Sequence, residues 1–152
     1  MPSTAFTGGQ IRAQSNAELD AVPPVDRFLS AVAGALMAGC DVWTPDAVLD
    51  ATVPEWRFRC VGPDAIRTEY GRWFADPGHF ESLRRLPIVG GEVVEYTLVW
   101  TEKGVPHTGH HLHVLELTDG LISRDTVFCG GRWPASLLAE MEAAQAATDA
   151  GS

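Results

Sequence analysis

The sequence predicts a single α+β domain in which helices come first and an antiparallel sheet follows. In the first half, apolar residues recur at helical spacing, whereas after Asp76-Pro77-Gly78 they alternate with period two. Short turns that contain glycine separate the alternating segments, as is typical of antiparallel hairpins. With 152 residues, 45% of them hydrophobic, the chain has the size of one domain and enough apolar mass for a core.

Residues 1–22 are rich in Ser, Thr, Gly, Gln and Ala without periodicity, and we expect a disordered leader there. We expect residues 23–142 to form the domain and residues 143–152 to form a disordered tail. The Pro23-Pro24 pair precedes a helix over Val25–Ala38, whose apolar positions share one face.

A second short helix is expected at Thr44, because Thr44 is a good N-cap and Pro45 suits a first helical turn. Residues Thr52–Val61 alternate between aromatic and charged side chains, which predicts an extended segment. Gly62-Pro63-Asp64 then begins a third helix over Ala65–Ala75 with an apolar stripe.

The second half predicts four successive antiparallel strands, which are Phe80–Val89, Glu92–Glu102, Val105–Leu117 and Leu121–Cys129. A two-residue turn at Lys103-Gly104 would pair Trp100 with His107, Tyr96 with His111 and Val94 with His113. One face of these strands is apolar and the other polar, as in a half-buried sheet. A last helix over Pro134–Ala147 would pack through Leu137, Leu138 and Met141.

The net charge of −9, with one lysine against ten arginines, argues against nucleic acid and anionic membranes as partners. We see no signal peptide and no membrane span, because the longest apolar run, Ala31–Met37, is too short. Cys40, Cys60 and Cys129 lack the spacing of metal ligands, so we expect reduced, inert thiols in a cytoplasmic protein.

The hairpin within His107–Cys129 carries the candidate chemistry. Strand alternation places His111 and His113 on one face, together with His107 and Leu115. A three-residue loop at Thr118–Gly120 would put His113 directly opposite Asp125. A two-residue turn at Asp119-Gly120 would instead shift the register by one residue and move Asp125 to the other face.

A histidine beside a carboxylate on an inward face is a candidate general base with its orienting partner. We predict His113 or His111 as the base, Asp125 as the orienting group and Tyr96 as a donor to a developing oxyanion. Core packing explains the nearby aromatic residues about as well as ligand binding does. The predicted substrate-binding residues are Phe28, Trp56, Trp73, Leu98, Trp100, Leu115 and Val127.

A metal site is the alternative use of these histidines. His111-x-His113 followed by Glu116 is similar to the cupin signature, but Glu116 would point to the opposite face. A site for Zn²⁺ or Fe²⁺ made by His107, His111 and His113 stays open. We nevertheless expect no metal and no cofactor.

Two segments carry a resemblance to a known superfamily. Asp50–Glu55, followed by Gly62–Ile66, resembles the part of ketosteroid isomerases that ends helix two and begins helix three. Asp119–Asp125 is similar to the hairpin before the last strand of SnoaL-like cyclases and limonene-epoxide-hydrolase-like enzymes. Over residues 25–130, the order and spacing of these segments resemble the nuclear transport factor 2-like (NTF2-like) superfamily.

The resemblance implies a cone-shaped, curled antiparallel sheet, a cystatin-like α+β barrel, wrapped around N-terminal helices and a hydrophobic pocket. It implies that Glu55 takes the place of the proton-shuttling carboxylate of the isomerases. It also implies that Asp125 is a pocket carboxylate, paired with His111 or His113 as in the cyclases. Val25–Ala38 has no tyrosine for the isomerase oxyanion, and Thr101–Val105 lacks the Asp-Arg-Asp set of the epoxide hydrolases.

We therefore expect a cofactor-independent enzyme that uses acid–base chemistry on a hydrophobic polyketide-, terpenoid- or steroid-like molecule. Cyclisation, isomerisation or dehydration would each suit these residues. One alternative is an epoxide hydrolase in which Asp125 or Glu55 activates water. Another is a non-catalytic module for small-molecule binding or assembly. We expect a homodimer that forms through the outer sheet face.

Overall fold

The structure is a computed structural model and describes residues 22–151. Its helices are α2 (Pro24–Gly34), the short 3₁₀ helix η1 (Met37–Gly39), α3 (Pro63–Trp73) and α4 (Ala135–Ala150). Its strands are β1 (Trp43–Val53), β2 (Trp56–Val61), β3 (Gly78–Ile88), β4 (Gly91–Glu102), β5 (Val105–Thr118), β6 (Leu121–Cys129) and β7 (Trp133–Pro134). The predicted α+β class is confirmed.

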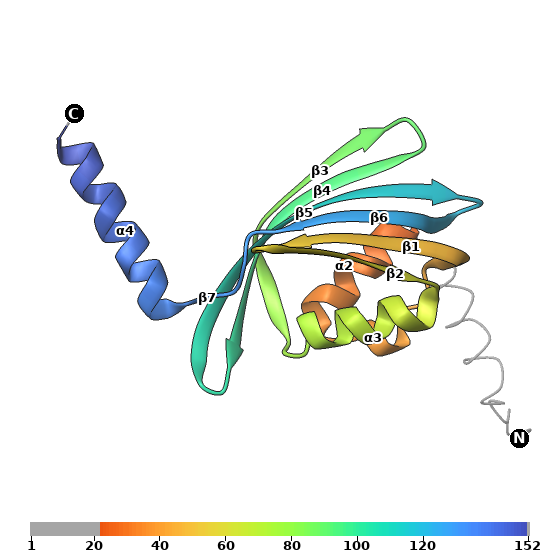
Figure 1. The fold of residues 1–152 in the computed structure, drawn as a ribbon, viewed down its shortest axis with the longest axis horizontal. Coiled ribbons are helices and arrows are strands. Elements are labelled where there is room, and N and C mark those ends of the chain that lie inside the picture. Colours follow the sequence, from red (N-terminus) through yellow and green to blue (C-terminus); the bar gives the residue numbers. More distant parts are fainter. Residues whose placement is uncertain (1–21, 152) are drawn as a thin grey trace, which may run out of the picture.

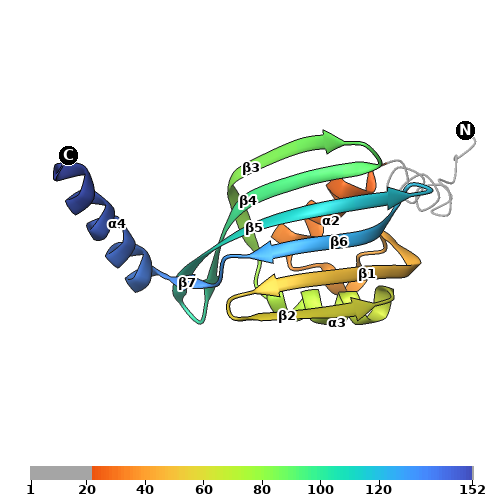
Figure 2. The ribbon, with the colours of Figure 1, turned by 45° about the horizontal axis from the view of Figure 1, so that its top comes forward.

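One curled sheet with free edges organises the molecule, in the order β2-β1-β6-β5-β4-β3, with the short β7 paired to β5 (Figure 2). The helices α2 and α3 lie inside the curl, which gives the predicted cone (Figure 1). Every strand pair is antiparallel except the pair of β1 and β6, which is parallel. The core fills the space between the two helices and the inner sheet face and includes Phe28, Val32, Leu49, Ile66 and Leu115.

The helix expected at Thr44 was wrong, because these residues belong to β1. Leu49 and Ala51 of this strand are buried, and it pairs with both β2 and β6. Pro45 falls where the register between β1 and β6 shifts, a place at which its missing N–H costs little. The Asp50–Glu55 segment is consequently the end of a strand and a turn, not the end of a helix.

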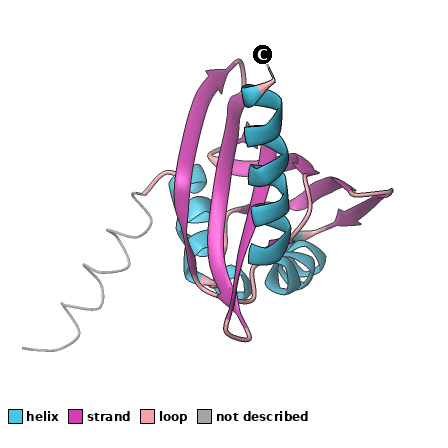
Figure 3. Cartoon of the chain, turned by 90° about the vertical axis from the view of Figure 1, so that its left-hand side faces the viewer, coloured by secondary structure: helices cyan, strands magenta, loops and turns pink. Residues whose placement is uncertain are grey.

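The helix boundaries differ from the prediction at both ends of the chain. Helix α2 ends at Gly34, because Ala35 adopts a left-handed conformation that caps it. Helix α4 continues through residues 143–150, which we expected to be a disordered tail. None of its side chains is buried, so the expected apolar stripe does not join the core, and α4 projects from one end of the molecule (Figures 1 and 3).

The expected leader, residues 1–22, lies outside the described residues except for Val22. No helix within residues 22–151 combines the length and the apolar character needed to cross a membrane.

The predicted strands of the second half are confirmed. The two-residue turn at Lys103-Gly104 has positive φ angles at both positions, as a tight hairpin requires. It sets the predicted pairs between β4 and β5, which are Trp100 with His107, Tyr96 with His111 and Val94 with His113.

The turn between β5 and β6 follows the alternative that we expected to move Asp125 outward. Asp119-Gly120 forms a two-residue turn, and Thr118 pairs with Leu121. A β-bulge then leaves Ser123 without a partner on β5 and shifts the register by one further residue. The bulge returns Asp125 to the inner face, where its side chain is fully buried.

The bulge also changes which residues face each other. Asp125 pairs with Leu115, and His113 pairs with Val127. The predicted direct opposition of His113 and Asp125 was therefore wrong. The two side chains are diagonal neighbours on the same face, a distance that long side chains can bridge.

Candidate functional site

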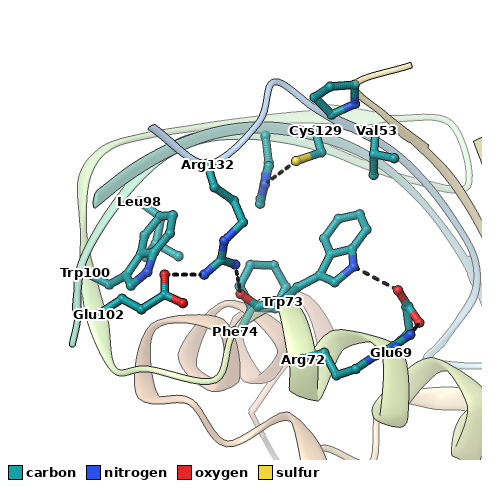
Figure 4. A pocket seen from close by; sticks show the side chains of 12 residues that line it. Val53, Glu69, Arg72, Trp73, Phe74, Leu98, Trp100, Glu102, Cys129 and Arg132 are labelled. Carbon is teal, nitrogen blue, oxygen red and sulfur yellow. Dashed lines mark hydrogen bonds and ion pairs between the residues drawn. The ribbon is translucent and has the colours of Figure 1, made fainter. Parts of the chain in front are cut away.

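A cavity of about 570 Å³ opens between the C-terminal end of α3 and the ends of β1, β4 and β6 (Figure 4). Its apolar wall includes Trp73, Phe74, Leu98 and Trp100, and its polar wall includes His111, Cys129, Glu102 and Arg132. Such a volume suits a ligand with one to a few rings, and a mostly apolar wall with a few polar groups is typical of small-molecule sites.

The predicted substrate-binding residues divide between the cavity and the core. Trp73, Leu98 and Trp100 line the cavity. Phe28, Leu115 and Val127 are fully buried core residues outside its lining, and Trp56 is 70% exposed on β2. Glu55 lies in the turn between β1 and β2, outside the lining, with a positive φ.

Asp125 is a fully buried carboxylate with two hydrogen-bond donors. The hydroxyl of Tyr70 on α3 donates to its Oδ2. Nδ1 of His113 lies 3.0 Å from Oδ1 and 3.1 Å from Oδ2, so this nitrogen carries the ring proton and donates. A buried carboxylate is costly unless it is well hydrogen-bonded, and these two donors meet that requirement.

The hydrogen bonds continue from His113 toward the cavity. With Nδ1 protonated, Nε2 of His113 has a free lone pair and lies 2.9 Å from the hydroxyl of Tyr96. Tyr96 donates its one hydroxyl proton there, and its oxygen then accepts from Nδ1 of His111, also at 2.9 Å. We call Asp125, His113, Tyr96 and His111 the relay.

His111 connects the relay to the cavity. Because its Nδ1 carries the ring proton, its Nε2 is an acceptor, and this nitrogen lies 3.1 Å from Sγ of Cys129. The dashed line from Cys129 in Figure 4 marks this contact. Every donor thus points toward Asp125, so a proton that enters at Nε2 can be passed on by one shift at each link.

Burial keeps His111 and Tyr96 uncharged at neutral pH. Burial lowers the pKa of His111 to about 3, with smaller contributions from His113, His110 and Arg132, so at neutral pH His111 is neutral. Burial raises the pKa of Tyr70 and that of Tyr96 well above 10, and the nearby Asp125 adds to both shifts. Both tyrosines therefore keep their hydroxyl protons at neutral pH, and a proton can cross the relay by concerted shifts that leave no tyrosinate at Tyr96.

The structure assigns different positions to the predicted catalytic residues. His111 lines the cavity, whereas His113, Tyr96 and Asp125 are fully buried behind it. Tyr96 was predicted to face a ligand oxyanion, but its hydroxyl lies between the two histidines.

The third histidine of the possible metal site lies elsewhere. His107 stacks on Trp100, and its Nδ1 lies 2.9 Å from the Val105 carbonyl oxygen. Over residues 22–151, no group of three or more His, Cys, Asp or Glu side chains is arranged to hold a metal ion.

Arg132 was missed from the sequence and, like Arg72, places a positive charge at the cavity. Its Nη1 donates to the Trp73 carbonyl oxygen at 2.9 Å, and its Nη2 donates to Glu102 at 2.9 Å. Its guanidinium lies 4.9 Å from the centre of the Trp100 ring, a cation–π contact (Figure 4). The salt bridge between Arg132 and Glu102 lowers the pKa of the Glu102 carboxyl group.

The sequence contained a signal for this part of the site. Gly130-Gly131-Arg132 follows the last long strand, and two glycines indicate a sharp change of backbone direction. Gly131 has a φ of 114°, and its backbone acts to lower the pKa of the Cys129 thiol. We expected Cys129 to be an inert thiol, but it lines the cavity beside a neutral histidine.

Comparisons with known proteins identify the fold. No protein-family model and no curated protein matches the chain. Among solved structures, an NTF2-like protein from Anabaena variabilis is 13% identical with a TM-score of 0.60, over 86% of this chain and 96% of that one.

Two further solved structures carry names that suggest an activity. A protein from Bacillus subtilis, provisionally named an isomerase, is 18% identical with a TM-score of 0.56, over 70% of this chain and 84% of that one. A protein from Xanthomonas campestris, provisionally named a polyketide cyclase, is 15% identical with a TM-score of 0.55, over 69% and 86%. The chain has the NTF2-like fold, as the sequence predicted.

Proposed function

We propose that this NTF2-like protein is an acid–base enzyme that moves a proton on a hydrophobic, ring-containing small molecule. The observation that carries the proposal is the connection of the cavity to Asp125 through the relay. His111 is the one histidine in the cavity lining of the described chain, and its Nε2 is free to accept a proton. A general base needs this combination of reach and an available lone pair.

In the proposed reaction, the ligand takes the place of the Cys129 thiol beside Nε2 of His111. As the ligand proton moves to Nε2, the proton on Nδ1 moves to Tyr96 and the Tyr96 hydroxyl proton moves to His113. The proton on Nδ1 of His113 then moves to Asp125. The ligand has lost one proton, Asp125 has gained one, and each group between them has the same charge as before.

The relay explains how His111 can act as a base although its pKa is about 3. That value describes a buried imidazolium, which the cavity disfavours through desolvation. When Nδ1 releases its proton as Nε2 accepts one, no imidazolium persists. The cost of placing a buried positive charge is then avoided, and the carboxylate of Asp125 neutralises the proton instead.

Arg132 would stabilise the negative charge that develops on the ligand. Loss of a proton next to a carbonyl group produces an enolate, and a fixed cation in an apolar cavity favours that charge strongly. Glu102, the Trp73 carbonyl and the Trp100 ring hold the guanidinium in place, so little reorganisation is needed. Isomerisation of a double bond, ring closure by an enolate and dehydration all pass through such an anion.

The walls of the cavity support the proposed substrate class. Trp73, Phe74, Leu98 and Trp100 suit a planar or ring-shaped hydrocarbon skeleton of polyketide, terpenoid or steroid type. The names of the similar structures from Bacillus subtilis and Xanthomonas campestris support isomerisation and cyclisation as the reactions to test first.

The test is a panel of cyclic β,γ-unsaturated ketones, with formation of the conjugated enone followed by ultraviolet absorbance. We expect turnover by the wild-type protein and a loss of at least about 100-fold in kcat for His111→Gln, the scale of a missing general base. His110→Gln is the matched control, because His110 is the preceding residue on β5 but its side chain is exposed on the other face. We expect this control to keep the wild-type rate.

Two results would count against the proposal. Equal turnover by wild type and His111→Gln would remove His111 as the base. Tight binding of the ketones without any turnover would instead support the non-catalytic binding module.

A further inference from the structure

Cys129 differs from the other two cysteines in two respects. It lines the cavity, and its sulfur lies 3.1 Å from the free Nε2 of His111. Cys40 is buried in the core, and Cys60 packs on β2 against the core from outside the cavity. A thiol beside a histidine acceptor in a cavity is the arrangement of an activated nucleophile.

We propose that Cys129 is a nucleophilic residue whose thiol adds reversibly to conjugated carbonyl compounds, such as enones, bound in the cavity. His111 accepts the thiol proton, and one proton shift at each link of the relay then protonates Asp125. This goes beyond the proposed function, since it assigns a covalent site. It shares the relay with that function but does not depend on turnover.

The environment of Cys129 keeps the sulfur as a thiol until a ligand is present. Burial raises the pKa of the thiol, which opposes a resting thiolate. The Gly131 backbone and the charge of Arg132 act in the other direction and lower it, though by less. Negative charge on the sulfur is thus disfavoured at rest and has two stabilising neighbours when the proton leaves during attack.

The addition balances without any further reagent. The sulfur forms a bond to the β-carbon of the enone, while the thiol proton passes to Nε2 of His111. The electron pair of the carbon–carbon double bond moves to the carbonyl oxygen and forms an enolate. The enolate then takes a proton back from Nε2 at its α-carbon, and the relay returns to its first state. The reverse steps release the enone.

The cavity favours a conjugated carbonyl over an acyl group as the electrophile. Its aromatic wall matches a flat conjugated ligand, and Arg132 can neutralise an enolate oxygen. Acyl transfer would also need a leaving group to be protonated and water to be brought to the sulfur. Conjugate addition requires neither, because the proton that leaves the sulfur is the one the product needs.

The experiment measures the rate at which 2-cyclohexen-1-one modifies each cysteine of the intact, folded protein, by peptide mass spectrometry. Cys60 in the same molecule is the internal reference. We expect Cys129 to react at least about 10-fold faster than Cys60, since general-base assistance is worth a factor of this size or more. Asp125→Asn should lower the rate at Cys129 at least about 10-fold and leave Cys60 unchanged.

Tyr96→Phe provides a second, independent interruption of the relay, with the fold checked by circular dichroism, so that one poorly folded variant does not decide the result. Equal rates at Cys129 and Cys60 would overturn the proposal. So would a fast Cys129 that ignores both variants, because the thiol would then be merely accessible. Ketone isomerisation without adducts removes only this inference, whereas adducts without isomerisation remove only the proposed function.

Discussion

His111 is the residue at which the apolar interior and the cavity meet. Its side chain is 6% exposed, contacts Trp73 and Phe74 on one side, and donates to Tyr96 on the other. The inward direction of the His111 side chain could be predicted from strand alternation. That His111 and not His113 lines the cavity could not be predicted, because this depends on how far α3 covers β5.

Acidification should destabilise the protein through His111. The pKa of this histidine is about 3 in the folded chain, against about 6.5 in an unfolded one, so between these values the unfolded state binds more protons. Stability therefore rises with pH across this window and is lost as the pH falls below about 6.5.

We predict that His111→Asn reduces the slope of unfolding free energy against pH by up to about 1.4 kcal/mol per unit between pH of about 4 and 6. Urea denaturation at several pH values measures the slope. His79→Asn, which alters an exposed histidine on β3 that does not act on His111, should leave the slope as it is. A parallel pair of curves for wild type and His111→Asn would show that His111 is not buried in neutral form.

Tyr96→Phe should be costly for stability as well as for the relay. It removes one oxygen and leaves two buried ring nitrogens, Nδ1 of His111 and Nε2 of His113, without partners. Each unsatisfied buried group costs about 1–3 kcal/mol, so for the two nitrogens we predict a loss of about 2–6 kcal/mol in urea denaturation. A loss near zero would contradict this prediction. It would mean that water replaces the Tyr96 hydroxyl, although this position is fully buried in the structure.

At the scale of elements, the β5–β6 hairpin shows what local sequence decides. Asp119-Gly120 favours a two-residue turn, and the structure has one. The bulge at Ser123 has no comparable local signal. It is held by the Ser123 hydroxyl, which accepts from Thr118 at 3.0 Å and donates to the Glu116 carbonyl at 3.2 Å. The inward direction of Asp125 is therefore a property of the packed hairpin.

Two single-residue deletions in β6 should have opposite effects. Deletion of Ser123 removes the unpaired residue and keeps Asp125 opposite Leu115, so the relay should survive with a small loss of stability. Deletion of Thr126 shortens the strand by the same amount. If the extra residue of the bulge then enters the regular pairing, Asp125 takes the place of Thr126 opposite Val114, on the outer face.

Nitrogen-15 NMR of the histidine rings distinguishes the two outcomes. We predict a protonated Nδ1 on His113 in wild type and after deletion of Ser123, but not after deletion of Thr126. Loss of this signal in both deletion variants would show that the bulge itself, and not only the register, holds Asp125 in place.

In β1, by contrast, the local sequence indicates the wrong secondary structure. Thr44-Pro45-Asp46 is a good helix start, and we predicted one, but the flanking β2 and β6 provide partners on both sides. Pairing and burial outweigh a cap that contributes about 1 kcal/mol. Helix propensity at such a segment is readable from the sequence, whereas the parallel neighbour β6, some 70 residues later, is not.

At the scale of the whole molecule, the fold was predictable and the site only in part. The period-two pattern and its turns set the order of four strands, from which the cone follows. The relay draws its groups from β4, β5 and β6, and Tyr70 of α3 completes it. Tyr96 and both histidines were predicted from strand faces, whereas Asp125 reaches the inner face only through the bulge at Ser123. Tyr70 and Arg132 reach the site only through packing of the helix and the chain after β6.

The outer sheet face is where we propose that a second copy binds. Phe128 is 50% exposed there, opposite Leu112, and the neighbouring Val114 is also apolar. Apolar side chains grouped on an outer face are typical of association surfaces. We predict dimers at micromolar concentration by analytical ultracentrifugation, and monomers for Phe128→Asp. Thr126→Asp on the same strand and face tests whether the effect is specific to the aromatic contact.

The closed end of the relay has a stereochemical consequence. His113, Asp125 and Tyr70 are each 0% exposed, so a proton that reaches Asp125 has no second route to solvent and must come back through His111. The nitrogen that removes hydrogen from a bound ligand is thus the one that returns it, from the same side. A double-bond shift in this cavity should be suprafacial, and a deuterium placed on the face toward His111 should be carried largely intact from the old position to the new one.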